Sequence, residues 1–179
     1  MKEIKELFMR IGIAFLLFLM PFNIFYILFA KITLFGSLPF LSLLGYTFNV
    51  DGYILTVGVK DLEFVPACVA TSAYYLLASL ILLTKGIDLK RRFYLFLTGS
   101  FLIFVANIAR IDILLFFLIE FGQNWFERVH LFFWHFVSSV YVAAVWIFLT
   151  YKFRIKAIPV YSDFKFLLSK SVFKKKKRR

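Results

Sequence analysis

Three residues of different chemical types could act together in one reaction: Cys68, Arg110 and His130. A thiol becomes a nucleophile when a general base and a cation lie beside it. His130 is the candidate base, because imidazole titrates near neutral pH and could later protonate a leaving amine. The guanidinium of Arg110 could stabilise an oxyanion or bind a substrate carboxylate. The three residue types together indicate nucleophilic chemistry at Cys68.

Two further residues could support this set. Asn107 precedes Arg110 by three positions, which places both on one helix face, where the amide could orient the guanidinium. His135 is the second histidine of the chain and could instead donate a hydrogen bond in helix packing. Asp112 follows Arg110 by two positions and is not expected to pair with it within a helix.

Each residue also has a simpler interpretation. A single cysteine in a membrane helix commonly serves as a small apolar side chain. His130 at a membrane interface could contact lipid headgroups. An arginine inside a membrane segment is costly and needs a buried acceptor even in a structural role. The catalytic interpretation therefore depends on whether the elements that carry these residues bring them together.

The composition predicts that those elements lie in a membrane. Of the 179 residues, 62% are hydrophobic and 21% are aromatic, including 26 phenylalanines. A soluble domain is nearer half apolar, so lipid is expected to solvate much of this surface. The net charge of +12 is expected to face anionic headgroups rather than nucleic acid, because the cations cluster at helix ends and in the tail. A single cysteine excludes an internal disulfide.

The hydrophobic runs predict an all-α integral membrane protein with about four transmembrane helices. The first is expected at about 11–30, as a retained helix rather than a cleaved signal peptide, with a kink at Pro21 and Asn23. Its flanking Lys31 ends it. The other three spans are expected at about 66–84, 93–120 and 129–151. The third is longer than a bilayer requires, so it is expected to tilt or break.

The connecting segments have different patterns. The run 32–47 is apolar but broken by glycines and a proline, which predicts an interfacial or re-entrant segment. Residues 48–64 are more polar and partly alternate, which predicts a small extracytoplasmic loop or hairpin. We expect a single membrane domain over 1–163 and a basic cytoplasmic tail over 164–179, whose last six residues are expected to be disordered.

Positive charge predicts the orientation. The cations of the N-terminus, of 85–92 and of the tail fall on one side of the four expected spans, which places both termini in the cytoplasm of a plasma-membrane protein. Cys68, in the opening turn of the second span, and His130, in the first turn of the fourth, then lie near the outer surface. Arg110 is expected roughly 10–15 Å below the outer loop at Gly122. Three residues from three helices thus share one predicted layer.

The motifs that carry these residues resemble the exosortase/archaeosortase family of multipass membrane cysteine transpeptidases. The family pattern is a cysteine that opens a helix, an N-x-x-R-I segment, and a later histidine or arginine. Cys68, the segment 107–111, and Gly122 followed by His130 match this pattern. The spacing from arginine through glycine to histidine favours His130 over His135 as the third member.

The resemblance covers roughly residues 48–163. The segments 130–139 and 158–163 are more similar to the small archaeal members than to the larger bacterial ones. Val69 and Ala70 stand where bacterial members often have Ser-Gly after the cysteine. The chain also lacks the extra helices of larger members.

The resemblance implies an enzyme that sorts secreted proteins. Its substrates would carry a C-terminal signal made of a short motif, a transmembrane helix and a basic cluster. Cys68 would attack the peptide bond near the motif, form a thioester at an outward-facing site, and pass the acyl group to an amine, expected on a lipid. Arg110 and His130 would be catalytic, with Asn107 and His135 in support. No metal or organic cofactor is implied, zinc-ligand spacing is absent from the sequence, and nucleic acid is not an expected partner.

Two other functions remain open on the residues alone. A non-catalytic membrane subunit, such as a transporter component or scaffold, would use Arg110 as an internal polar tie. A membrane thiol acyltransferase would share Cys68 but not the N-x-x-R-I pattern. Loss of substrate processing in a Cys68→Ala variant would separate an enzyme from a scaffold.

Overall fold

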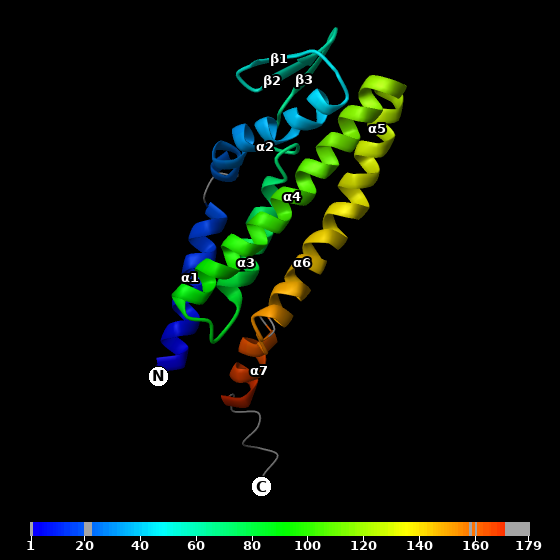
Figure 1. Cartoon of the computed structure of the whole chain (residues 1–179). Coiled ribbons are helices and arrows are strands. Elements are labelled where there is room, and N and C mark those ends of the chain that lie inside the picture. Colours follow the sequence, from blue (N-terminus) through cyan, green and yellow to red (C-terminus); the bar gives the residue numbers. More distant parts are fainter. Residues whose placement is uncertain (1, 20–22, 158, 160, 171–179) are drawn as a thin grey trace.

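The computed structural model describes residues 2–19, 23–157, 159 and 161–170. Helices make up most of it, and one small sheet lies at one end of the molecule (Figure 1). The bounds are α1 Lys2–Leu19, α2 Asn23–Leu43, β1 Phe48–Asp51, β2 Ile54–Val57, β3 Lys60–Glu63, α3 Thr71–Leu83, α4 Leu89–Phe121, α5 Gln123–Phe132, a π-helical turn η1 Phe133–Val137, α6 Ser138–Lys152 and α7 Tyr161–Lys170. The predicted mainly helical architecture is confirmed.

Helix α4 is the central element of the fold. It runs unbroken for 33 residues, which corresponds to about 50 Å at the helical rise. The span was expected to tilt or break, and no break occurs within it. One buried cluster joins α4 to α3 and α6, and a second joins it to α2 and the sheet. The first cluster includes Tyr74, Leu77, Leu95, Ile103 and Leu149, and the second includes Leu34, Leu55, Phe64, Ile111 and Leu115.

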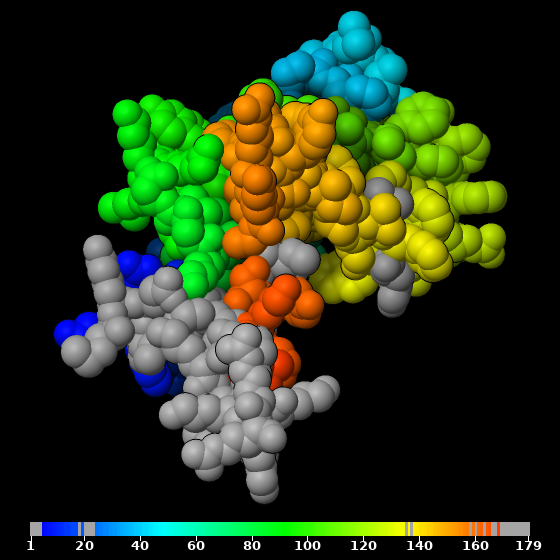
Figure 2. Space-filling view, turned by 90° about the horizontal axis from the view of Figure 1, so that it is seen from below, coloured from blue at the N-terminus to red at the C-terminus, as the bar shows by residue number. Residues whose placement is uncertain are grey.

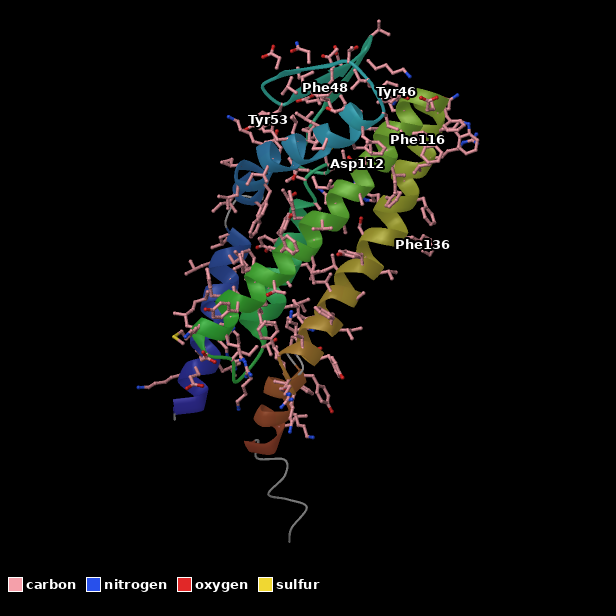
Figure 3. All side chains as sticks on the ribbon, viewed as in Figure 1. Tyr46, Phe48, Tyr53, Asp112, Phe116 and Phe136 are labelled. Atoms are coloured by element: carbon pink, nitrogen blue, oxygen red, sulfur yellow. The ribbon has the colours of Figure 1, made fainter. Side chains whose placement is uncertain are left out.

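Within the described residues, two helices have the length and hydropathy expected of membrane spans. They are α4 and the part of α2 over Ile24–Leu43, and α3 is a shorter apolar helix. Aromatic side chains also cover the outer faces of the bundle, such as Phe136 of η1, which is 68% exposed and projects away from the other helices (Figure 3). Exposed aromatic side chains of this kind fit a lipid environment.

The helices in the N-terminal part of the chain begin and end at other residues than predicted. The prediction of a separate interfacial or re-entrant segment over 32–47 is wrong in its division of the chain, because α2 continues through Gly36 and Pro39 to Leu43. Gly36 does not break the helix but allows close packing, since a Cβ there would lie 2.6 Å from the Ile108 side chain of α4. The predicted kink at Pro21 falls outside the described residues; α1 ends at Leu19 and α2 begins at Asn23.

The polar segment after α2 forms a three-stranded antiparallel sheet, which confirms the predicted hairpin and extends it. The strand order is β1-β2-β3, with Asp51 opposite Ile54 and Val57 opposite Lys60 at the two turns. Gly52 and Gly58 open these two-residue turns with φ of 59° and 62°. A positive φ at this position suits a tight hairpin turn, and glycine adopts it without strain.

Side chains fasten the sheet to the helices below it. The Lys60 ammonium donates to the Leu118 and Ile119 carbonyls near the end of α4, at 2.6 and 3.2 Å. The Tyr26 hydroxyl of α2 donates to the Phe64 carbonyl at 2.7 Å. Because Phe64 directly follows β3, these bonds fix the chain four residues before Cys68.

The opposite end of the molecule carries the basic loops. The start of α1, the beginning of α4 and the helices α6 and α7 all reach this end (Figures 1 and 2). Arg92 caps the C-terminus of α3 through its guanidinium, which donates to the Leu82 and Thr84 carbonyls at 2.9 Å each. The predicted boundary at residue 163 falls inside α7, and the final six basic residues lie outside the described part of the chain.

Candidate functional site

Cys68 lies in a tight turn rather than in the first turn of a helix. Its backbone N–H donates to the Val65 carbonyl at 2.8 Å. Ala70 then adopts a left-handed conformation with φ of 56°, which interrupts the helical path, so α3 begins at Thr71 rather than at Pro66. The expectation that Cys68 lies in the opening turn of this span is therefore corrected. A direct helix-dipole effect on the thiol is correspondingly weaker.

The thiol itself is half-buried beneath the sheet. Its Sγ atom points toward the Glu63 carbonyl oxygen at 3.9 Å and packs against the cluster that includes Leu34 and Leu55. Burial raises the pKa of the Cys68 thiol, and the opposing effects of the Val65 hydrogen bond and of nearby Arg110 do not reverse this. The resting thiol is therefore protonated at neutral pH, and its reaction requires a base.

Asn107 and Arg110 connect α4 to the turn that carries Cys68. The Asn107 amide Nδ2 donates to the Cys68 carbonyl at 2.8 Å, and Arg110 donates from a terminal nitrogen to the Ala67 carbonyl at 3.4 Å. Both side chains are buried, with 4% and 7% exposed. Asn107 was expected to orient Arg110, but the structure assigns each of them its own backbone carbonyl on the turn.

His130 is carried by α5 and lies near Arg110. Its ring is 5.7 Å from that of Phe126 and 6.2 Å from that of Trp134, and it is close enough to Arg110 for their charges to interact. Among the described residues no hydrogen bond joins His130 to Cys68. Arg110 is close enough to both for its charge to act on each of them. His135 belongs to η1, but its side chain lies outside the described residues.

Three buried polar atoms near this point have no hydrogen-bond partner in the described structure. They are Asn107 Oδ1, Arg110 Nε and His130 Nδ1. Buried polar groups are nearly always paired, and unpaired ones concentrate where a ligand or water binds. The three atoms belong to residues that the sequence singled out, which supports a binding site at this place.

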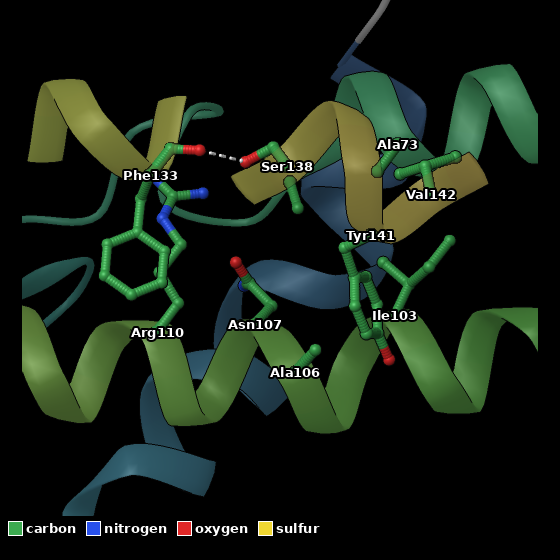
Figure 4. A pocket seen from close by; sticks show the side chains of 10 residues that line it. Ala73, Ile103, Ala106, Asn107, Arg110, Phe133, Ser138, Tyr141 and Val142 are labelled. Carbon is green, nitrogen blue, oxygen red and sulfur yellow. Dashed lines mark hydrogen bonds between the residues drawn. The ribbon is translucent and has the colours of Figure 1, made fainter. Parts of the chain in front are cut away.

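A cavity lies next to Asn107 and Arg110, between α3, α4 and the start of α6 (Figure 4). His130 is not among the residues that line it. The volume of the cavity is about 70 Å³, and its walls include Ala73, Asn107, Arg110 and Ser138. A neighbouring hollow of about 270 Å³ shares Ala73, Arg110 and Ser138 with it. Cys68 is not among the residues that line either space, although Ala67 and Ala70 on its two sides are.

The family follows from a comparison made with models of known protein families. The model described as Transmembrane exosortase (Exosortase_EpsH) matches residues 6–152, more than four fifths of the chain. The chain belongs to the transmembrane exosortase family. The resemblance seen in the sequence is thereby confirmed, and a membrane location is supported by both the family and the apolar helices. Comparisons with curated proteins and with solved structures found no match.

One feature of this exosortase-family chain was missed in the sequence. The helix that carries His130 and Ser138 contains the π-helical turn η1 beside the cavity, and Ser138 Oγ donates to the Phe133 carbonyl at 2.8 Å across it (Figure 4). Such turns are rare and often occur at functional sites. Hydropathy and helix periodicity carry no signal for this turn, so Phe133 and Ser138 could not be recognised as cavity residues.

Proposed function

We propose that this chain is a membrane-embedded cysteine peptidase and transpeptidase that cleaves the C-terminal sorting signal of secreted proteins. The observation that carries the proposal is the attachment of the Cys68 turn to Asn107 and Arg110, beside a cavity with unpaired polar atoms. The apolar length of α2 and α4 supports a membrane setting. About four spans, with the site on the outer side, are part of the proposal.

The reaction begins with activation of the thiol. Because the Cys68 thiol holds its proton at neutral pH, the imidazole of His130 removes that proton as Sγ attacks the scissile carbonyl. Sγ points toward Glu63 in the resting structure, so a rotation of the cysteine side chain toward Arg110 precedes attack. The carbonyl π electrons move onto oxygen, and the guanidinium of Arg110 stabilises this oxyanion.

Collapse of the oxyanion breaks the carbon–nitrogen bond. The leaving amine takes the proton from His130, and the remaining acyl group stays on Cys68 as a thioester. An acceptor amine, expected on a lipid, then attacks the thioester carbonyl and loses a proton to His130, which returns it to the sulfur. Attack by water instead of an amine gives hydrolysis with the same proton transfers.

Co-expression with a substrate tests the proposal. The substrate is a secreted protein that ends in a short motif, a transmembrane helix and a basic cluster, and processing is read as a loss of mass on a gel. We expect Cys68→Ala to abolish processing, while Ser42→Ala, at an exposed position of α2, leaves it unchanged. Retained processing in correctly inserted Cys68→Ala protein would favour the non-catalytic subunit instead.

A further inference from the structure

Asn107 and Arg110 each use only part of their hydrogen-bonding capacity on the Cys68 turn. Asn107 donates through Nδ2 and leaves its acceptor Oδ1 without a partner, whereas Arg110 donates through a terminal nitrogen and leaves the donor Nε without one. Both side chains are more than nine-tenths buried and line the cavity of about 70 Å³. The cavity therefore presents one unused acceptor and one unused donor, on successive turns of α4.

The two unused groups are complementary to a peptide group. A peptide group has one donor, the N–H, and one acceptor, the carbonyl oxygen, and in the trans form they point in opposite directions. It can therefore bridge two partners at different heights along a helix. A carboxylate or phosphate supplies acceptors only, and an ammonium supplies donors only, so neither satisfies Asn107 Oδ1 and Arg110 Nε together.

The walls of the cavity suit such a group. Ala70, Ala73 and Ala106 line it with methyl groups, and Figure 4 shows the Asn107 and Arg110 side chains rising from α4 toward the η1 and α6 side of the space. A volume of about 70 Å³ exceeds the ~10–15 Å³ that one water needs, which leaves room for a group of several heavy atoms. The space is mainly apolar apart from the groups that a peptide would engage.

We propose that this cavity binds one peptide group of the substrate, whose N–H donates to Asn107 Oδ1 and whose carbonyl oxygen accepts from Arg110 Nε. The inference rests on the proposed function, because the bound group is taken to flank the scissile bond. Since Arg110 and Asn107 also hold the carbonyls of the two peptide groups that precede and follow Cys68, binding of the substrate backbone orders the turn that carries the nucleophile. Asn107 thereby becomes a residue that contacts substrate.

A minimal amide probe tests this binding without a known substrate. N-methylacetamide has one N–H and one carbonyl, whereas N,N-dimethylacetamide and methyl acetate retain the carbonyl and lack the N–H. Protein labelled with ¹⁵N at asparagine is titrated with each probe in detergent micelles, and the side-chain amide signal of Asn107 is followed. Asn124, exposed on α5, is the internal control. We expect a saturable shift at Asn107 with N-methylacetamide and at least fivefold weaker binding of the other two probes.

A pair of matched variants locates the effect. Ala106→Leu fills the cavity and is expected to abolish the shift, whereas Ala109→Leu, at an exposed position of the same helix, should leave it intact. Equal binding of N,N-dimethylacetamide, or an Asn107 signal that none of the probes moves, would overturn the inference and leave water as the partner of both groups.

The amide-binding experiment and the processing experiment can fail independently of each other. Absence of amide selectivity, together with loss of processing in Cys68→Ala, would remove the peptide-binding cavity and retain the enzyme. Amide-selective binding, together with full processing by Cys68→Ala, would retain the cavity and remove the proposed reaction.

Discussion

Asn107 and Cys68 are 39 residues apart in the chain, and a hydrogen bond of 2.8 Å joins the side-chain amide of one to the backbone carbonyl of the other. Arg110, one turn further along α4, holds the preceding carbonyl of Ala67. The position of the nucleophile thus depends on a helix that is remote in sequence, and not only on its own turn. This relationship determines which substitutions should matter.

Replacing Asn107 should destabilise this attachment. Asn107→Ala leaves the Cys68 carbonyl without its partner in a buried place, which costs about 1–3 kcal/mol in the free energy of unfolding. Ser100→Ala on the same helix is the matched control, because its hydroxyl is also buried but has no partner to lose. Thermal unfolding in detergent should show a lower midpoint for the first variant only. Equal midpoints would mean that the bond contributes little to the folded state.

The shape of the Arg110 side chain should matter as well as its charge. Lysine keeps the charge but lacks the planar fork that can hold the Ala67 carbonyl and a substrate oxygen together. Arg110→Lys is therefore expected to reduce the rate of substrate processing at least tenfold. A tenfold loss corresponds to an activation free energy that is higher by about 1.4 kcal/mol. Arg91→Lys, exposed near the start of α4, should be neutral. Normal processing by Arg110→Lys would reduce Arg110 to a point charge.

The two histidines should differ in their effects. His130 is near Arg110 and has a buried, unpaired Nδ1 atom, so His130→Ala should abolish processing if it supplies the base. His135→Ala should leave processing within a few fold, as expected of a supporting residue in helix packing. Both variants are scored by the rate of substrate processing at equal expression. The reverse order would assign the base to His135.

The reaction of the Cys68 thiol with iodoacetamide should accelerate at a higher pH than the reaction of an ordinary thiol does. Burial raises the pKa of Cys68 above the ordinary thiol value of about 8.5, so alkylation should accelerate with pH to a midpoint above that value. The folded state holds this proton more tightly than the unfolded state. This difference contributes to the free energy of unfolding. The contribution is fully present below the pKa that Cys68 has in the unfolded state, and it is lost as the pH rises through the pKa of the folded state. Urea-unfolded protein, with the same single cysteine, supplies the reference curve, and a folded midpoint below it would contradict the burial effect.

The sequence was most informative where hydropathy or residue type decides the outcome. The helical architecture, the polar hairpin after α2 and the meeting of Arg110 with the Cys68 turn all follow from apolar runs and from the cost of a buried arginine. The hairpin could be expected because alternating residues and glycine turns are local signals. The family was likewise recognisable from short motifs, since they involve only neighbouring residues.

Other features depend on contacts between distant segments. Gly36 suggested a broken helix, but its small size instead serves the packing of α2 against Ile108. The left-handed Ala70 that delays α3 has no signal in residue type, since alanine usually favours the helix. Arg110 lies 12 residues before Gly122 on an unbroken helix, which is about 18 Å along the helix axis. The π turn beside the cavity also lacked a local signal.

The most direct test of the central claim is the mass of the enzyme during turnover. Purified protein is mixed with a peptide that spans a substrate's motif and part of its helix, quenched in acid and analysed by mass spectrometry. We expect an adduct equal to the acyl part of the peptide, located on Cys68, removed by hydroxylamine and absent from Cys68→Ala. Efficient cleavage of the peptide by Cys68→Ala, or an adduct carried by any other residue, would contradict the account.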